Sequence, residues 1–220
     1  MEPALPPCSV DALLFDVGGV LIDVDFRLAF DYWARCANVS VDQIAGRFRP
    51  DAAYEAHERG EISSVEYFSA LRQSLGIDLP DDQFAHGWCA IFRGAIPGAG
   101  ELLARLARVR PVFLFSNTNA LHYERWTAQF PELVAPVTRI ICSQQIGLRK
   151  PAVEAYEKVC SMIGVAPQRI AFFDDLAENV EGARRAGLTA FHVPSFDHTR
   201  RAAAHLLGPP ADEHAGHATL

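Results

Sequence analysis

The stretch Ala12-Leu-Leu-Phe-Asp16-Val-Gly18-Gly19-Val-Leu-Ile22 predicts how the chain folds. Its first four residues are apolar, as in a buried strand, and the run ends abruptly in the acid Asp16. Two glycines follow, and glycine lets the backbone turn sharply where other residues resist it. A carboxylate in this place lies where a parallel sheet meets its ligand crevice. On this stretch alone, an acid that only caps a loop explains the pattern equally well.

Three later stretches place small polar or charged residues at the end of an apolar strand or just before a helix. They are Phe113-Leu-Phe-Ser116-Asn117-Thr-Asn119, Gly147-Leu-Arg-Lys150-Pro151 and Ala171-Phe-Phe-Asp174-Asp175. In an open parallel sheet, ligands bind outside the carboxyl ends of the strands, so these residues would face one crevice. Taken singly, these patterns have ordinary explanations. Ser-Asn-Thr-Asn, for example, is typical of a polar turn. Adjacent acids are likewise typical of a solvated helix start.

From Gly98 onward, helical and strand patterns alternate along the chain. We expect strands at 112–115, 139–142, 170–173 and 188–193. We expect helices at 101–109, 121–130, 151–163 and 178–186. The third would begin with Pro151, so Lys150 would lie at the electropositive start of that helix. Such alternation predicts the α/β class with a doubly wound parallel sheet.

Between Phe26 and Pro97 the hydrophobic pattern is different. Apolar residues recur there at helical spacing, and we expect no strand. Ser63-Ser64-Val-Glu66 predicts a helix start with a capping box. We therefore predict an α-helical cap at 26–97 inserted into a core of residues 1–25 and 98–207, with a disordered tail at 208–220. A helical subdomain with no role toward a substrate is the plainer alternative.

The composition excludes several classes of protein. With 220 residues, 50% of them hydrophobic, the chain can bury a large core. Its net charge of -7 and scattered basic residues argue against binding nucleic acid. No apolar run approaches the roughly 20 residues that cross a bilayer, and the N-terminus lacks the features of a signal peptide. The odd, widely spaced cysteines predict reduced thiols in a cytoplasmic protein: Cys8, Cys36, Cys89, Cys142 and Cys160.

The four motifs, in this order, resemble those of the haloacid dehalogenase (HAD) superfamily. Within it the chain is similar to the bacterial alpha-D-glucose-1-phosphate phosphatases over roughly residues 11–195. The shared segments are Phe-Asp-Val-Gly-Gly-Val, His57-Glu-Arg-Gly-Glu-Ile62, Ser116-Asn-Thr-Asn119 and Phe172-Phe-Asp-Asp-Leu-Ala-Glu-Asn179. The resemblance implies a Rossmann-like HAD core with a cap that closes over the substrate. It also implies a Mg²⁺-dependent phosphatase of small phosphorylated metabolites, with sugar phosphates such as glucose-1-phosphate favoured. Both a monomer and a homodimer stay open.

The resemblance assigns a role to each motif. Asp16 would be the nucleophile that forms an aspartyl-phosphate. Ser116 and the backbone N–H of Asn117 would hold phosphoryl oxygens. Lys150 would neutralise both Asp16 and the phosphate.

The metal site implied by the resemblance consists of oxygen ligands, which suit Mg²⁺. Its members would be Asp16, Asp174, Asp175 and the backbone carbonyl of Gly18, with Asn179 supporting an acid from the next helix. Asp23-Val-Asp25 offers a rival pair of acids, but there the glycines precede the acid instead of following it. We therefore favour Asp16 over Asp23 as the nucleophile.

Gly18 departs from the family pattern, since most HAD phosphatases carry there a second Asp that protonates the leaving group. General acid–base help is worth about 10²–10⁴-fold in rate. His57, Glu58 and Arg59 could supply the missing group or read sugar hydroxyls, although a surface helix end explains them equally well.

Two other functions stay open. One is a 2-haloacid dehalogenase, which uses the same Asp, Ser and Lys without metal, although its signature has a small neutral residue where Asp174 stands. The other is a catalytically weak HAD binding module.

Overall fold

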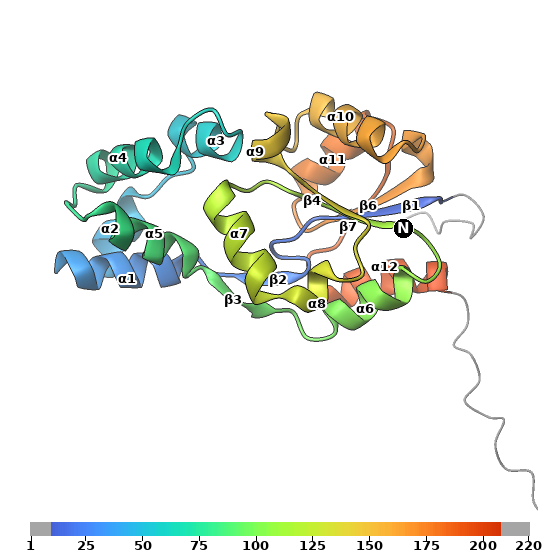
Figure 1. The fold of residues 1–220 in the computed structure, drawn as a ribbon, viewed down its shortest axis with the longest axis horizontal. Coiled ribbons are helices and arrows are strands. Elements are labelled where there is room, and N and C mark those ends of the chain that lie inside the picture. The colour runs from blue at the N-terminus through green and yellow to red at the C-terminus, as the bar shows by residue number, and fades with distance from the viewer. Residues whose placement is uncertain (1–9, 208–220) are drawn as a thin grey trace, which may run out of the picture.

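A computed structural model describes residues 10–207, and at its centre is a sheet of five parallel strands in the order β5-β4-β1-β6-β7 (Figure 1). The strands are β1 (Ala12–Phe15), β4 (Val112–Ser116), β5 (Arg139–Cys142), β6 (Ile170–Asp174) and β7 (Thr189–His192). From β1 the chain extends the sheet first toward β5 and later toward β7, so the strand order reverses at β1. A ligand crevice is expected at that reversal. The predicted α/β class with a doubly wound parallel sheet is confirmed.

Helices cover both faces of this sheet, because successive strand residues point to opposite sides. Leu13 and Phe15 pack into one apolar cluster, while Ala12 and Leu14 pack into another. The first face is covered by α6 (Ala99–Leu106), α7 (Ala120–Gln129), α8 (Pro131–Val134) and α12 (Phe196–Leu207). The second is covered by α9 (Ser143–Ile146), α10 (Val153–Ile163) and α11 (Ala177–Arg185), and the 3-10 turn Pro167–Arg169 precedes β6. Burial on both sides explains why the strands read as continuous apolar runs.

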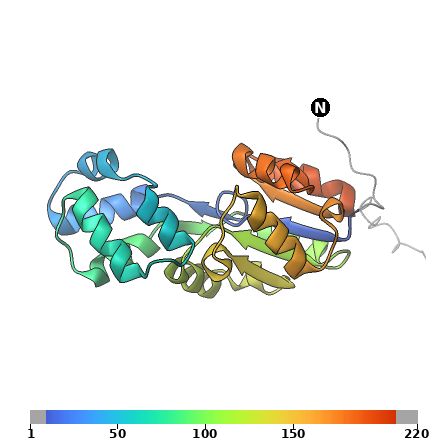
Figure 2. The ribbon, with the colours of Figure 1, turned by 90° about the horizontal axis from the view of Figure 1, so that it is seen from above.

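Five further helices form a separate group beside the sheet, which we call the helical insert (Figure 2). They are α1 (Arg27–Ala37), α2 (Val41–Arg47), α3 (Ala52–Glu58), α4 (Ser64–Leu75) and α5 (Asp81–Cys89). The insert has its own aromatic core, in which the rings of Trp33 and Trp88 stack with centroids 6.2 Å apart. The capping box at Ser63 is confirmed, since Ser63 and Glu66 bond reciprocally at the start of α4. The division of the chain at 25/26 and 97/98 stays a prediction.

An antiparallel pair of strands joins the insert to the core. It consists of β2 (Ile22–Val24) and β3 (Phe92–Ala95). The expectation that no strand lies between residues 26 and 97 was therefore wrong. The sequence Phe92-Arg-Gly-Ala has no clear alternation, and it is extended here because β2 offers it a pairing edge.

The start of the helix after Lys150 differs from the expectation. Helix α10 begins at Val153, and Pro151 lies in the turn before it. Lys150 therefore precedes the first turn of the helix and does not belong to it. The backbone of Lys150 is instead held by the side chain of Asn117. Helices α8, α9 and α12 were not foreseen.

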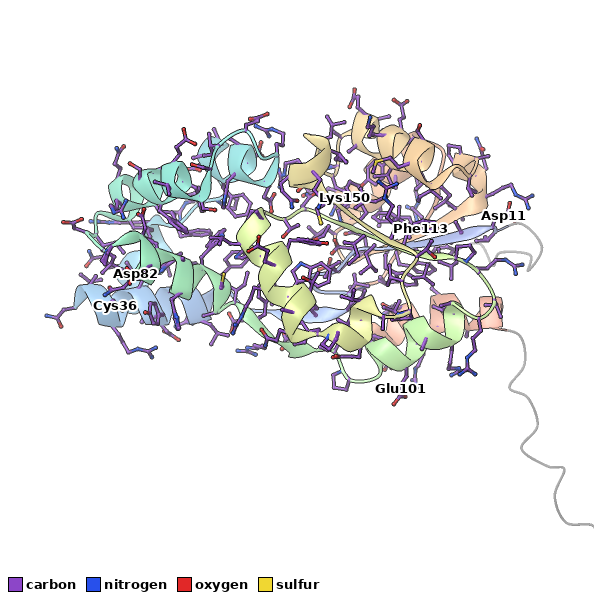
Figure 3. The ribbon with its side chains drawn as sticks, in the orientation of Figure 1. Asp11, Cys36, Asp82, Glu101, Phe113 and Lys150 are labelled. Carbon is purple, nitrogen blue, oxygen red and sulfur yellow. The ribbon has the colours of Figure 1, made fainter. Side chains whose placement is uncertain are left out.

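The remaining predictions concern the cysteines, the C-terminal tail and the crossing of a membrane. Cys142 and Cys160 are buried and Cys36 is exposed on the helical insert, far from the buried Lys150 (Figure 3). Cys89 is half-buried, and none of these four thiols forms a disulfide. Cys8 and the predicted tail at 208–220 lie outside the described residues. Between residues 10 and 207, no helix combines the length and the apolar character that crossing a bilayer requires.

Candidate active site

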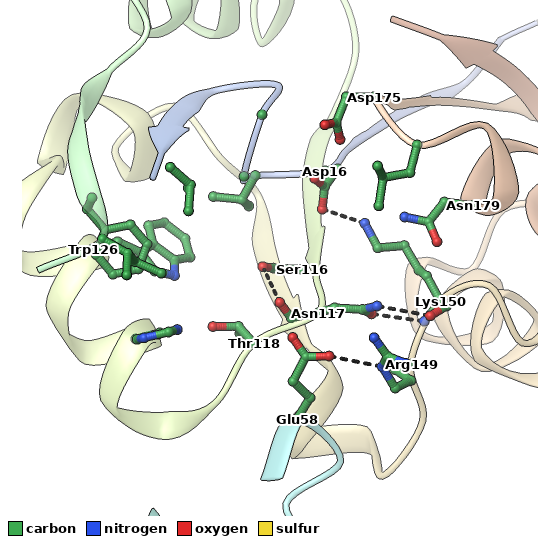
Figure 4. A pocket seen from close by; sticks show the side chains of 18 of the residues that line it. Asp16, Glu58, Ser116, Asn117, Thr118, Trp126, Arg149, Lys150, Asp175 and Asn179 are labelled. Carbon is green, nitrogen blue, oxygen red and sulfur yellow. Dashed lines mark hydrogen bonds and ion pairs between the residues drawn. The ribbon is translucent and has the colours of Figure 1, made fainter. Parts of the chain in front are cut away.

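The carboxyl ends of the central strands open into a pocket of about 330 Å³, a size typical of small-molecule sites (Figure 4). Strand β1 is followed by Asp16, β4 ends with Ser116, and β6 ends with Asp174. The pocket is lined by most of the predicted site residues, namely Asp16, Gly18, Ser116, Asn117, Lys150 and Asp175. Asp174 lies behind them, fully buried.

Lys150 is the cation of this site. Its side chain is 1% exposed, and Nζ contacts a carboxylate oxygen of Asp16 and lies 2.7 Å from Oδ2 of Asp174. Burial alone would lower the pKa of Lys150, but the two carboxylates outweigh it, so the net effect is a raised pKa. Lys150 is therefore a positive charge held between two acids.

Asp174 is fixed from several sides. Asn179 Nδ2 donates to both of its carboxylate oxygens at 3.0 and 3.1 Å, and the backbone N–H of Leu176 donates to Oδ1 at 2.9 Å. The expected contact of Asn179 with an acid of the pair is thus confirmed. With Lys150 as a further partner, Asp174 has little freedom to turn.

Asp175 is half-buried and faces the turn after β1. Burial raises the pKa of Asp175, and the charge of Asp174 adds to this effect. Gly19 has a φ of +78°, and a β-carbon on it would collide with the Asp175 carboxylate. Glycine is required at this position both for the turn and for the close approach of the acid.

The acids form a set that fits a hard cation. Asp16, Asp174 and Asp175 each offer a carboxylate oxygen, and these atoms lie within 4.8 Å of one another. Carboxylate oxygens are the ligands that Mg²⁺ prefers. Asp23, the rival acid, lies on β2 with its side chain 56% exposed, and its nearest cation is Arg93 at 3.9 Å. The structure thus clusters Asp16, and not Asp23, with the acidic pair.

Asn117 joins two of the motifs. Its Nδ2 donates to the carbonyl oxygen of Lys150 and its Oδ1 accepts from the N–H of Lys150, both at 2.9 Å. This use of the side chain was not foreseen, because the sequence argument concerned only the backbone N–H of Asn117. Ser116 Oγ makes one long contact, 3.5 Å, with the carbonyl oxygen of Asn117. The roles of Ser116 and Asn117 toward a phosphate stay predictions.

The three neighbours His57, Glu58 and Arg59 have different surroundings. Glu58 lines the pocket and is paired with Arg149, whose Nε lies 2.9 Å from Oε2 of Glu58. Burial raises the pKa of Glu58, and Arg149 opposes that effect. His57 packs inside the insert, where burial lowers its pKa to about 4. Arg59 pairs with glutamates on the surface of the insert.

Much of the rest of the pocket lining consists of residues that the sequence did not assign to the site. This part is mostly apolar and includes Val24, Phe26, Ile91, Phe92, His122 and Trp126. The sequence did contain a signal for two of them. His122 and Trp126 come after the Ser116 motif and are four residues apart from each other. That spacing places both on one face of α7.

Comparison with known proteins agrees with this arrangement. A family model described as a haloacid dehalogenase-like hydrolase matches residues 10–187. Phosphatase MT3486 of Mycobacterium tuberculosis is 29% identical over 201 residues, which cover 87% of this chain and 91% of that protein. D-ribitol-5-phosphate phosphatase of Bacteroides thetaiotaomicron is 23% identical over 185 residues, covering 81% of this chain and 89% of that protein.

Among solved structures, the HAD family enzyme BT-2542 of Bacteroides thetaiotaomicron in its magnesium complex is similar at a TM-score of 0.74 and 25% identity. The likeness covers 84% of this chain and 93% of that one. Since the family model spans four of the five strands of the sheet, the helical insert and all four motifs, the chain belongs to the haloacid dehalogenase-like hydrolases.

Proposed function

We propose that this chain is a Mg²⁺-dependent phosphatase of small phosphorylated metabolites. The observation that carries the proposal is the contact of the Asp16 carboxylate with the buried Lys150 ammonium at the wall of one pocket, beside Asp175. A carboxylate nucleophile, a fixed cation and an acidic pair are what phosphoryl transfer through an aspartyl-phosphate requires.

The reaction proceeds in two steps at phosphorus. A carboxylate oxygen of Asp16 bonds to phosphorus while the bond from phosphorus to the leaving oxygen breaks, and the leaving oxygen takes up a proton from solvent. A water molecule then attacks phosphorus, loses a proton to solvent and breaks the bond from phosphorus to Asp16, which releases inorganic phosphate and restores Asp16. Lys150 offsets the charge of Asp16 and of the phosphoryl oxygens, while Ser116 Oγ and the Asn117 N–H donate to those oxygens.

Mg²⁺ would be held by Asp16, Asp174, Asp175 and the carbonyl of Gly18, and when bound it supplies further positive charge against the phosphate. The oxygens of the three acids lie within 4.8 Å of one another, which supports this assignment. Lys150 and Asn179 hold the carboxylate of Asp174 in place.

We infer that sugar and polyol phosphates, glucose-1-phosphate among them, are the substrates. The similarity to D-ribitol-5-phosphate phosphatase supports this class. In this proposal the helical insert is the cap that covers the leaving group and excludes water.

The test is hydrolysis of p-nitrophenyl phosphate and of a panel of sugar phosphates, with Mg²⁺ and with EDTA. We expect phosphate release that needs Mg²⁺ and falls at least about 10³-fold in Asp16→Asn. The matched control is Asp23→Asn, which removes the exposed rival acid and should retain activity within about twofold.

Two results would overturn the proposal. The first is equal activity of Asp16→Asn and Asp23→Asn. The second is metal-independent chloride release from 2-chloropropionate without any phosphatase activity, since that outcome identifies a dehalogenase.

A further inference from the structure

The pocket has two chemically different ends. Asp16, Lys150 and Asp175 form the charged end, and Trp126 lies across the pocket from them (Figure 4). Much of the remaining lining is apolar, and Phe26 and Phe92 belong to it. Because the phosphoryl group belongs at the charged end, the leaving alcohol must occupy the end near Trp126.

Trp126 carries a hydrogen-bond donor without an acceptor. Its side chain is 1% exposed, and no described residue accepts from Nε1. Buried donors in proteins are nearly always paired, so an unpaired one on a residue that lines a pocket indicates that an acceptor is missing. Trp88 Nε1 and Tyr67 OH also lack partners within residues 10–207, but neither residue lines the pocket.

His122 supplies the complementary atom. Its Nε2 lies 2.9 Å from the carbonyl oxygen of Trp88. A carbonyl oxygen can only accept, so Nε2 carries the hydrogen. Burial lowers the pKa of His122 to about 3, and the ring is therefore neutral. Nδ1 then has a free lone pair, and none of the hydrogen bonds of the described chain uses it.

The two side chains belong to one surface. His122 and Trp126 are four residues apart on α7, so they lie one turn apart on the same face of the helix, and both line the pocket. Helix α7 starts at Ala120, directly after the Ser116 motif, and the last residue of that motif, Asn119, is its N-cap. The same short segment thus provides groups to both ends of the pocket.

We propose that Trp126 and His122 form a hydroxyl-recognition subsite, in which Trp126 Nε1–H donates to hydroxyl oxygens of the leaving alcohol and His122 Nδ1 accepts from them. The subsite selects polyhydroxylated phosphate esters over alkyl or prenyl phosphates, which the aromatic walls alone would accept. This inference rests on the proposed phosphatase function. An apolar analogue would leave both buried groups unpaired, and a site of this kind rejects substrates that lack the hydroxyl.

The first experiment needs no variant. With Mg²⁺ present, kcat/KM is measured for a hexitol phosphate, its singly deoxygenated analogues, n-hexyl phosphate, farnesyl phosphate and p-nitrophenyl phosphate. We expect the hexitol phosphate to exceed n-hexyl and farnesyl phosphate by at least about 10²-fold, and at least one deoxy analogue to lose about 3- to 10-fold.

The second experiment is Trp126→Phe, which keeps an aromatic ring but removes the N–H. We expect the ratio of kcat/KM for the hexitol phosphate to kcat/KM for p-nitrophenyl phosphate to fall about 3- to 10-fold, because p-nitrophenyl phosphate has no hydroxyl. The matched control is Tyr123→Phe, which removes a polar group of α7 outside the pocket and should leave the selectivity unchanged.

The outcomes separate this inference from the proposed function. Hydrolysis of n-hexyl or farnesyl phosphate as efficient as that of the hexitol phosphate overturns the subsite while the phosphatase proposal stands. The absence of Mg²⁺-dependent hydrolysis of every ester, p-nitrophenyl phosphate included, overturns both. If Trp126→Phe does not fold, the wild-type panel still decides.

Discussion

The ion pair between Arg149 and Glu58 links the core to the helical insert, and Arg149→Met removes it. Arg149 Nε lies 2.9 Å from Glu58 Oε2, and Nη1 lies 2.9 Å from Glu55 Oε1. The Glu58 side chain is 7% exposed, whereas Glu55 is 44% exposed. Losing the contact with Glu55 should therefore cost less than about 1 kcal/mol, and the main effect should come from Glu58, which is left buried without its cation.

Protonation of Glu58 limits that cost. Its ordinary pKa is 4.5, and one pKa unit corresponds to about 1.4 kcal/mol, so neutralising it at pH 7 costs at most about 3.4 kcal/mol. We expect Arg149→Met to lower the free energy of unfolding by about 2–3 kcal/mol at pH 7. Without the arginine the pKa of Glu58 rises further above its value in the unfolded chain, so this loss grows as the pH increases. At pH 5 it should be less than about 1 kcal/mol.

Urea unfolding at pH 7 and pH 5, followed by circular dichroism, measures both values. The matched control is Arg59→Met, because Arg59 also contacts Glu55 but has only surface partners. It should cost less than about 1 kcal/mol at either pH. Adding Glu58→Gln to Arg149→Met should recover about 1–2 kcal/mol. Equal costs for Arg149→Met and Arg59→Met, or a cost that does not change between the two pH values, would refute the reasoning.

Three further predictions concern the missing acid, a buried histidine and a tightly packed glycine. A β-carbon at Gly18 would meet only one methyl group, at 3.5 Å, so the side chain of Gly18→Asp should fit. This variant should raise kcat for sugar phosphates by about 10²-fold because it restores a general acid, whereas Gly18→Asn should leave kcat low. His57 stays neutral in the folded chain down to about pH 4, but it protonates near pH 6.5 in the unfolded chain. Acidification from pH 7 to pH 5 should therefore lower the free energy of unfolding of the wild type by about 2 kcal/mol more than that of His57→Gln, as measured by urea titration. Gly182→Ala would place a methyl group against the carbonyl oxygen of Pro151 and should lower the free energy of unfolding by about 1–3 kcal/mol. The control is Gly46→Ala, where a methyl group meets open space and should raise the free energy of unfolding by about 0.5–1 kcal/mol. Thermal unfolding measures both values.

The sheet was predictable because its strands are buried on both faces and therefore stand out as apolar runs between amphipathic helices. The motifs at Asp16, Ser116 and Asp174 were predictable for the same reason, since a polar residue at the end of such a run marks a strand end. Strand β3 was not, because Phe92-Arg-Gly-Ala has no pattern of its own and is extended only through pairing with β2. Short strands of this kind depend on tertiary context more than on propensity.

Within the site, the residues next to the strands could be found from sequence, and those brought in by packing could not. Glu58 and Arg149 are 91 positions apart, and nothing local indicates that they meet. Trp126 fits a core or an interface position equally well in the sequence, and its four-residue spacing from His122 shows only that the two share a helix face. The position of Lys150 was argued from a helix start, yet its backbone is set by Asn117, and such a contact between a side chain and a distant peptide has no signature in the sequence.

The double hydrogen bond from Asn117 to the peptide of Lys150 has a consequence for the entropy of binding. One amide group that donates to and accepts from the same residue leaves the two loops little freedom to shift or rotate against each other. The Ser116 hydroxyl and the Lys150 ammonium therefore keep their relative position before any substrate arrives. A ligand that contacts both then freezes fewer degrees of freedom than it would at two independent loops, so more of its contact energy is retained as affinity.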